Sequence, residues 1–199
     1  MAIEVISSSV RISSRLFKVE YVRFICNSCI FKIKIMSITK SYLLELGHEV
    51  NSTKKIVACV PTDKWGWKPH EKSMSLGDLA KHIVELIIWT ENILTKDGLD
   101  FQVDYKPLEA KTTEELLVLL DKYEKAVISA LNMFDEEKWM SEWKLKSGDH
   151  IIVAMPKVGA NRFIVNNHIY HHRGQLSVYL RLLDIPIPGM YGPSADDVK

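Results

Sequence analysis

Four stretches of the chain have apolar residues at spacings of three and four, which places those residues on one face of a helix. These stretches cover residues 37–60, 76–94, 112–135 and 160–183. A helix with one apolar face must bury that face against other elements, and four such helices can do so around a shared core. The pattern therefore predicts an all-α four-helix bundle.

Local sequence marks several helix ends. Ser75 precedes the second helix and Asp78 follows three residues later, which is the spacing of a capping box. Thr112 and Glu115 repeat this spacing at the start of the third helix. Pro61 is expected to end the first helix, because it has no backbone N–H to donate.

The connections between the helices differ in character. Trp65 and Trp67 lie in a link rich in glycine and proline, and we expect them to anchor it in the core. Residues 95–111 are expected to form a long loop. Apolar residues alternate on both sides of Ser147-Gly148-Asp149, which predicts a short irregular hairpin between helices three and four.

Composition limits the class of protein. The chain has 199 residues, of which 47% are apolar, and its 26 basic residues nearly balance its 25 acidic ones. No long run of one charge suggests a nucleic-acid partner, and no apolar run approaches the roughly 18 to 20 residues of a membrane-spanning helix. Three cysteines indicate a reducing compartment rather than a disulfide framework, so a cytoplasmic location is expected.

Residues 1–35 differ from the rest of the chain. They are rich in serine and net basic, and they show no helical or strand periodicity. We expect an N-terminal extension, either disordered or not native, with translation starting at Met36 and a helical domain over residues 36–199. A basic, serine-rich and acid-poor segment is also typical of an organellar transit peptide, which remains an alternative. Cys26-x-x-Cys29 has the spacing of metal or redox sites but lacks a second cysteine pair.

Two histidines stand four residues apart in the fourth helix. Residues at this spacing project from the same side, so His168 and His172 can reach one cation. Burying two imidazoles without partners would be costly, so a metal site is as plausible for this pair as plain core packing. The inward stripe of this helix is expected to contain Ile164, Val165, His168, His172, Gln175, Leu176, Tyr179, Leu182 and Leu183.

His82 is the candidate third ligand, because it lies on the apolar face of the second helix. Catalytic zinc sites typically have three protein ligands and keep one position for water or substrate. A core histidine is the alternative for His82. Gln175, one turn beyond His172, is expected to support a ligating imidazole or to make an ordinary polar contact. Glu85 and Glu91 are expected on the outer side of the second helix.

Three segments carry a family resemblance. Asn167–Leu176 contains a histidine, three residues and then His-Arg-Gly-Gln, and it resembles the last-helix signature of the DinB-like (damage-inducible) family. Lys72–His82 resembles the start of that family's second helix, and Pro186–Ser194 resembles the tail of bacterial members. The resemblance covers Met36 to the end of the chain. It implies an up-down-down-up bundle, often homodimeric, with a divalent metal on His82, His168 and His172 and water completing its coordination.

The resemblance leaves the reaction and the catalytic residues open. Relatives include thiol-dependent S-transferases and isomerases, which implies a small-molecule thiol or electrophile as partner. Three imidazoles suit zinc, nickel, copper or iron, and we expect zinc or nickel. A metal-dependent hydrolase is an alternative, although Glu85 and Glu91 on the outer side would leave it without a general base. The remaining alternative is a non-enzymatic, stress-related metal-binding or dimeric interaction protein.

Overall fold

The computed structural model describes residues 2–12, 15–26, 29–34 and 37–197. The chain divides into two compact units, Met1–Ser41 and Tyr42–Lys199. The boundary expected between residues 35 and 36, and with it the start of translation expected at Met36, lies outside the described residues.

The N-terminal unit contains a three-stranded antiparallel sheet. Its strands are β1 (Ala2–Ile12), β2 (Arg15–Cys26) and β3 (Cys29–Lys34), in the order β1-β2-β3. Sequence periodicity did not predict these strands, because a run of serines interrupts the alternation of apolar residues in β1. The expectation that this segment is an extension or is not native remains a prediction.

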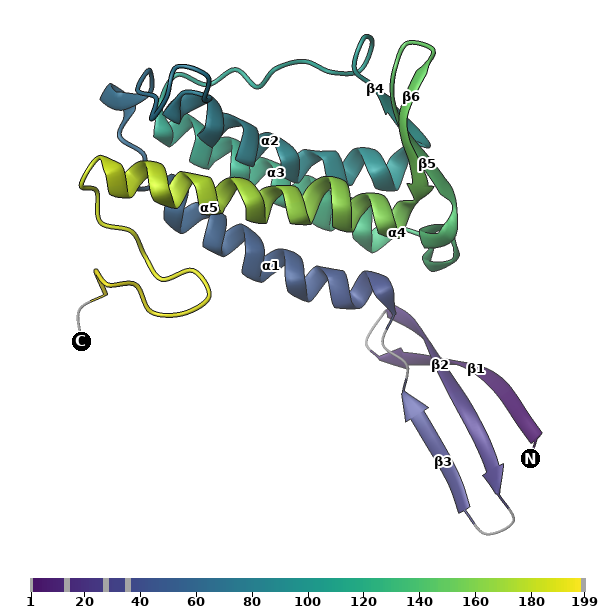
Figure 1. Ribbon diagram of the computed structural model, residues 1–199. Helices are drawn as coiled ribbons and strands as arrows, with labels where there is room; N and C mark the ends of the chain where they lie inside the picture. The colour runs from purple at the N-terminus through teal and green to yellow at the C-terminus, as the bar shows by residue number, and fades with distance from the viewer. Residues whose placement is uncertain (1, 13–14, 27–28, 35–36, 198–199) are drawn as a thin grey trace. The chain divides into compact units, whose positions relative to one another are not determined.

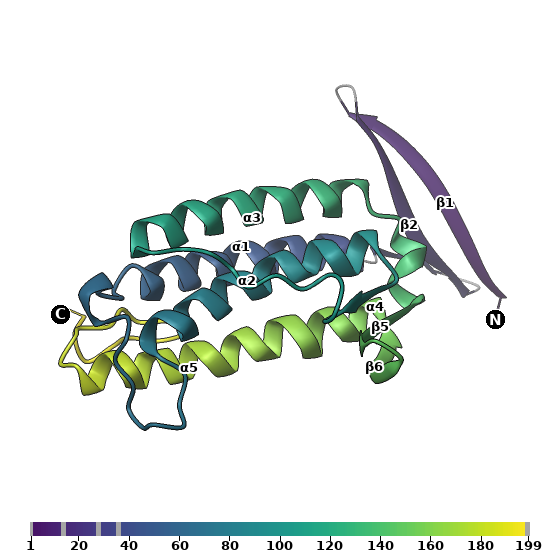
Figure 2. The same ribbon diagram turned by 90° about the horizontal axis from the view of Figure 1, so that it is seen from above.

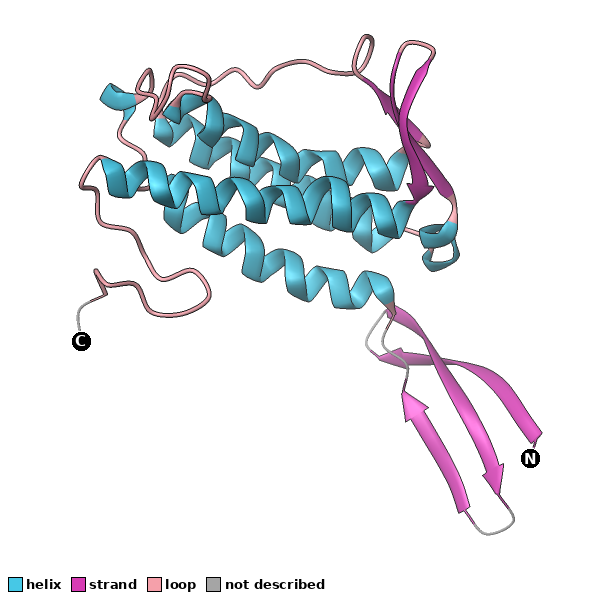
Figure 3. Cartoon of the chain, viewed as in Figure 1, coloured by secondary structure: helices cyan, strands magenta, loops and turns pink. Residues whose placement is uncertain are grey.

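The predicted four-helix bundle is confirmed. Its first three helices are α1 (Ile38–Val57), α2 (Leu76–Thr95) and α3 (Thr113–Met133). The fourth consists of α4 (Lys157–Ala160), a π-helical segment (Asn161–Asn166) and α5 (Asn167–Leu182), which follow one another without a break (Figures 1 and 3). Residues 96–112, the returning segment, run back along the bundle after α2, so α2 and α3 run in the same direction (Figure 1). Figure 2 shows α3 and α5 on opposite sides of α2, which makes α2 central.

The caps and inward faces follow the sequence pattern in the first three helices. The Ser75 hydroxyl accepts from the Asp78 N–H, and the Thr112 hydroxyl accepts from the Glu115 N–H. In α1 the residues at spacings of three and four are buried, namely Tyr42, Leu46, Val50, Thr53 and Val57, whereas Ile38 is 37% exposed. The apolar faces of these helices therefore pack as the sequence predicted.

The fourth helix buries most of its predicted face, including Val165, His172 and Leu176. Gln175 and Leu182 were also expected inside, but both are exposed. The fully buried stripe includes Ile169 and Leu180, which lie beside the predicted positions. The π-helical segment was not predicted, because it has no periodic signal of its own.

The predicted hairpin between helices three and four is confirmed, with strands β5 (Glu142–Ser147) and β6 (His150–Pro156) and an irregular register between Leu145 and Lys146. The expected loop 95–111 contains one strand, β4 (Gly98–Asp100), which pairs in parallel with β5. The sequence did not predict β4, because a strand of three residues is too short to show an alternation of apolar and polar residues. The pairing of β4 with β5 fixes the start of the returning segment.

No helix of the described residues combines the length and the apolar character needed to cross a membrane.

A buried polar cluster joins α1, α2 and the π-helical segment just before the histidines of α5. The hydroxyls of Tyr42 and Thr90 lie 3.2 Å apart, and the Tyr42 hydroxyl donates to Asn166 Oδ1 over 3.1 Å. Thr90 also donates to Asn161 Oδ1 over 3.0 Å. Burial raises the pKa of Tyr42, so its proton stays in place at neutral pH. The cluster fixes the rotation with which the last helix enters the bundle.

We expect Thr90→Val to lower the free energy of unfolding by roughly 1–3 kcal/mol, because it leaves the Asn161 amide oxygen buried without its donor. Urea denaturation measures the change. Thr95→Val is the matched control on the same helix: Thr95 is exposed, and among the described residues its hydroxyl bonds only to the Glu91 carbonyl, so its effect should stay within about 0.5 kcal/mol. Equal effects of the two substitutions would contradict this role for the cluster.

Candidate metal centre

Packing of α2 against α5 brings together the three histidines predicted as ligands. His82 comes from α2, and His168 and His172 come from successive turns of α5. One nitrogen from each ring lies within 4.8 Å of those of the other two. His82 Nε2 and His168 Nε2 are 3.4 Å apart, and the His172 ring centroid is 4.8 Å from that of His82. Three nitrogen donors thus surround a space of the size that a single cation occupies.

Each ring has a partner away from this space. His82 Nδ1 lies 3.3 Å from Glu85 Oε2, and His172 Nδ1 lies 2.7 Å from Gln175 Oε1. The backbone carbonyl of Ile164 accepts a hydrogen bond from the His168 ring. An imidazole that donates from one nitrogen presents a lone pair on the other. This pattern of outer hydrogen bonds is the one that metal-ligating histidines show, so the residues fit a divalent metal.

The surroundings of His168 and His172 make protonation of these two rings unfavourable. Burial, and then the proximity of His172 and His82, lowers the pKa of His168 to about 4. Burial likewise lowers the pKa of His172, although the bond to Gln175 acts in the opposite direction. Both rings are therefore neutral at pH 7, which is the form that binds metals.

Glu85 corrects an expectation from the sequence. It was placed on the outer side of α2, but its side chain is buried, with 6% of the residue exposed, and it contacts the ring of His82. The returning segment covers this side of α2, and the hydroxyl of its Tyr105 donates to Glu85 Oε2 over 3.4 Å. A helical wheel assigns such a position to solvent because it cannot include a long loop that folds back over the helix. A carboxylate therefore lies beside the histidines after all.

Arg173 holds α5 in place directly after His172. Its guanidinium donates to the Glu49 carbonyl over 2.8 Å and to Thr53 Oγ1 over 3.2 Å, and it pairs with the Glu49 carboxylate. It also lies 5.4 Å from the ring centroids of both Tyr170 and Tyr191. These contacts join α5 to α1 and to the C-terminal tail. Sequence reasoning gave Arg173 no role, although it belongs to the His-Arg-Gly-Gln motif.

A small pocket opens on the outer side of the centre. We call it the histidine-side pocket; its volume is about 140 Å³, and its lining includes His82, Glu85, Tyr105, Lys81 and Leu108. A molecule of a few atoms in this pocket would lie next to the His82 ring. His171, exposed on α5, lies outside the triad.

The fold and this cluster define a helical bundle with a candidate three-histidine metal centre. The chain belongs to the DinB family, whose model matches residues 36–199. The N-terminal sheet lies outside the match.

Relatives and solved structures agree with this assignment. The chain is 29% identical to the uncharacterized protein YjoA of Bacillus subtilis over 134 residues, which are 66% of this chain and 81% of YjoA. It is 24% identical to the uncharacterized protein YrdA of the same organism over 150 residues, 75% of this chain and 85% of YrdA.

Crystal structures show the same fold. The DinB-like protein YjoA of Bacillus subtilis matches with a TM-score of 0.60 and 22% identity, over 75% of this chain and 97% of YjoA. A DinB-like protein of Bacillus cereus also matches with a TM-score of 0.60, at 23% identity, over 78% of this chain and 98% of its own. Similarity at this level supports the bundle and leaves the activity open.

We expect Gln175→Ala to weaken zinc binding by about 10- to 100-fold, because the His172 ring loses the partner that orients it. Competition with a chromogenic chelator measures the dissociation constant. Gln175 is exposed, so the fold should be unaffected, and Gln102→Ala in the returning segment serves as a control. Equal zinc affinity in all three proteins would show that Gln175 does not orient a ligand.

Proposed function

We propose that this DinB-family protein binds a divalent metal, zinc or nickel, through His82, His168 and His172 and catalyses transfer of a thiol to a small electrophile. The observation that carries the proposal is the convergence of three imidazoles whose other nitrogens are hydrogen-bonded. Structural zinc sites are closed by four protein ligands, whereas three ligands leave a position for substrate. Within the described residues, the cluster contains these three donors and no fourth.

A divalent metal in this position would lower the pKa of a bound thiol, so that its sulfur is nucleophilic at neutral pH. The residues of the chain orient the ligating rings and form the pocket for the thiol. Glu85 and Gln175 orient two of the rings. Tyr105 and Leu108 line the histidine-side pocket and give a small thiol an apolar wall beside His82.

The overall reaction needs no further reactant. The S–H bond of the thiol breaks and its proton passes to water at the pocket mouth. A bond forms between sulfur and the electrophilic carbon, and the leaving group departs with the electron pair of its former bond. Besides activating the thiol, the site has to hold the two substrates close together, and this proximity supplies a large part of the rate acceleration.

A metal-dependent hydrolase is the second candidate, and the position of Glu85 favours it. The sequence argument against a hydrolase was the lack of a carboxylate near the histidines, and Glu85 is buried among the residues of the histidine-side pocket. In a hydrolase, Glu85 would accept a proton from the attacking water. The two candidates differ in whether a thiol is consumed.

The test is a rate assay of the zinc- or nickel-loaded protein with monochlorobimane and a panel of small thiols, beside p-nitrophenyl acetate without thiol. Transfer predicts a thiol-dependent fluorescent product, lost on chelation and in His82→Ala. His48→Ala, an exposed histidine of α1, is the control that should keep the wild-type rate. Ester cleavage without thiol would favour the hydrolase. No rate above the chelated control for either substrate would contradict both.

A further inference from the structure

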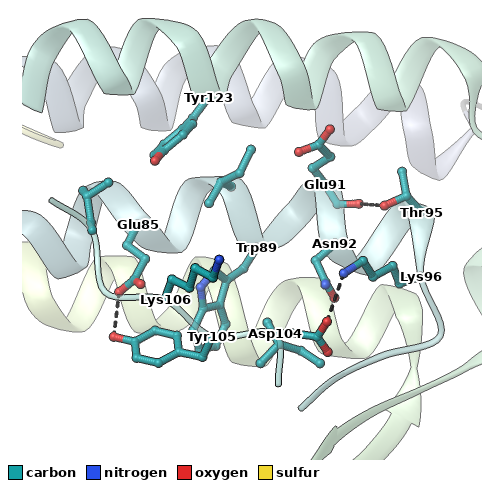
Figure 4. A pocket seen from close by; sticks show the side chains of 13 residues that line it. Glu85, Trp89, Glu91, Asn92, Thr95, Lys96, Asp104, Tyr105, Lys106 and Tyr123 are labelled. Carbon is teal, nitrogen blue, oxygen red and sulfur yellow. Dashed lines mark hydrogen bonds and ion pairs between the residues drawn. The ribbon is translucent and has the colours of Figure 1, made fainter. Parts of the chain in front are cut away.

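A second and larger cavity lies on the far side of Glu85 from the histidines. We call it the lateral cleft; it lies between α2, α3 and the returning segment, and its volume is about 380 Å³. Figure 4 shows Glu85 and Trp89 from α2, Tyr123 from α3 and Tyr105 from the returning segment around it. This volume is in the lower part of the range of about 300–1,000 Å³ that small-molecule sites occupy.

Glu85 gives the cleft a buried negative charge without a matching cation. Both of its hydrogen-bond contacts use Oε2, at 3.3 Å from His82 Nδ1 and 3.4 Å from the Tyr105 hydroxyl. Oε1 has no hydrogen-bond partner among the described residues. The fully buried unpaired side-chain atoms of those residues are Trp65 Nε1 and Arg173 Nε, so Oε1 is accessible from a cavity that Glu85 lines. A carboxylate has several acceptor sites, and those of Glu85 are only partly used.

The other charges of the cleft do not neutralise Glu85. Lys96 is exposed and pairs with Asp104 over 3.2 Å. Lys106 is exposed, and within the described part of the chain neither lysine forms an ion pair with Glu85 or Glu91. Glu91 adds a second carboxylate to the lining. Two lysines thus line the cleft together with the carboxylates, and Lys106 reaches toward the Trp89 ring in Figure 4, but neither lysine pairs with Glu85.

Aromatic side chains surround this charge. The rings of Trp89 and Tyr105 lie 6.5 Å apart between centroids at an interplanar angle of 81°. Tyr123 is close enough to Glu85 that, after burial, the charge of Glu85 raises the pKa of its hydroxyl. The faces of aromatic rings attract cations, and rings beside a carboxylate are the usual surroundings of a bound ammonium group.

We propose that the lateral cleft binds a small organic amine, with its ammonium group on Glu85 Oε1 and its apolar body between Trp89 and Tyr123. Apolar lining from Ile88, Leu99 and Leu108 suits a hydrocarbon or aromatic body. Because Oε2 of the same carboxylate contacts His82, the amine would bind one side chain away from the histidine centre. The inference does not depend on the proposed transferase activity.

The test is isothermal titration calorimetry of the full-length, metal-free protein with three probes of similar shape: phenethylamine, phenethyl alcohol and phenylacetate. We expect phenethylamine to bind saturably and at least roughly tenfold more tightly than the other two, since only it pairs with the carboxylate and the rings. Glu85→Gln keeps the shape of the side chain and should abolish this preference. Glu114→Gln, an exposed residue of α3 outside the cleft, should preserve it.

A second measurement on the unaltered protein covers the case in which Glu85→Gln does not fold. Phenethylamine should shift the NMR resonances of the Trp89 indole N–H and the Tyr123 ring, which face the cleft. Equal affinity for amine and alcohol, tighter binding of phenylacetate, or shifts elsewhere than the cleft would overturn the proposal. Zinc affinity is measured on separate samples, so a protein that binds zinc but shows no preference for the amine contradicts only this inference.

Discussion

The contact between α2 and α5 is the constraint on which the candidate centre depends. Each helix places histidine on the face that it buries against the other, so the packing that forms the core also brings three imidazoles together. Rings held this closely make protonation unfavourable, as the lowered pKa of His168 shows. Three ring nitrogens that converge in this way fit a cation between them.

The rotation of α5 has to be accurate for this geometry, and buried polar contacts on both sides fix it. Before the histidines, Tyr42, Thr90 and Asn161 join the π-helical segment to α1 and α2. After them, Arg173 pairs with Glu49 of α1. Polar contacts of this kind are directional, whereas apolar packing alone tolerates small rotations. The bundle thus fixes the last helix on both sides of the histidine rings along the chain.

Much of the fold could be predicted from the sequence because amphipathic helices have a regular period and helix caps are local. The α2 start at Ser75 and the α3 start at Thr112 follow from a few neighbouring residues. The pairing of His168 with His172 follows from helix geometry, and the resemblance to the DinB-like family implied His82 as their third partner. What the sequence could not give depends on tertiary structure. The π-helical segment and the burial of Glu85 under the returning segment both lack a local sequence pattern.

The central claim is that His82, His168 and His172 form one metal site. Elemental analysis of the purified protein, beside His82→Ala, His168→Ala and the neighbouring His171→Ala, tests it most directly. We expect about one zinc or nickel ion per chain in the parent and in His171→Ala, and almost none in the other two, because each lost ligand leaves the ion with only two. Unchanged metal content in His82→Ala and His168→Ala, or no metal in the parent after incubation with zinc or nickel, would contradict the account.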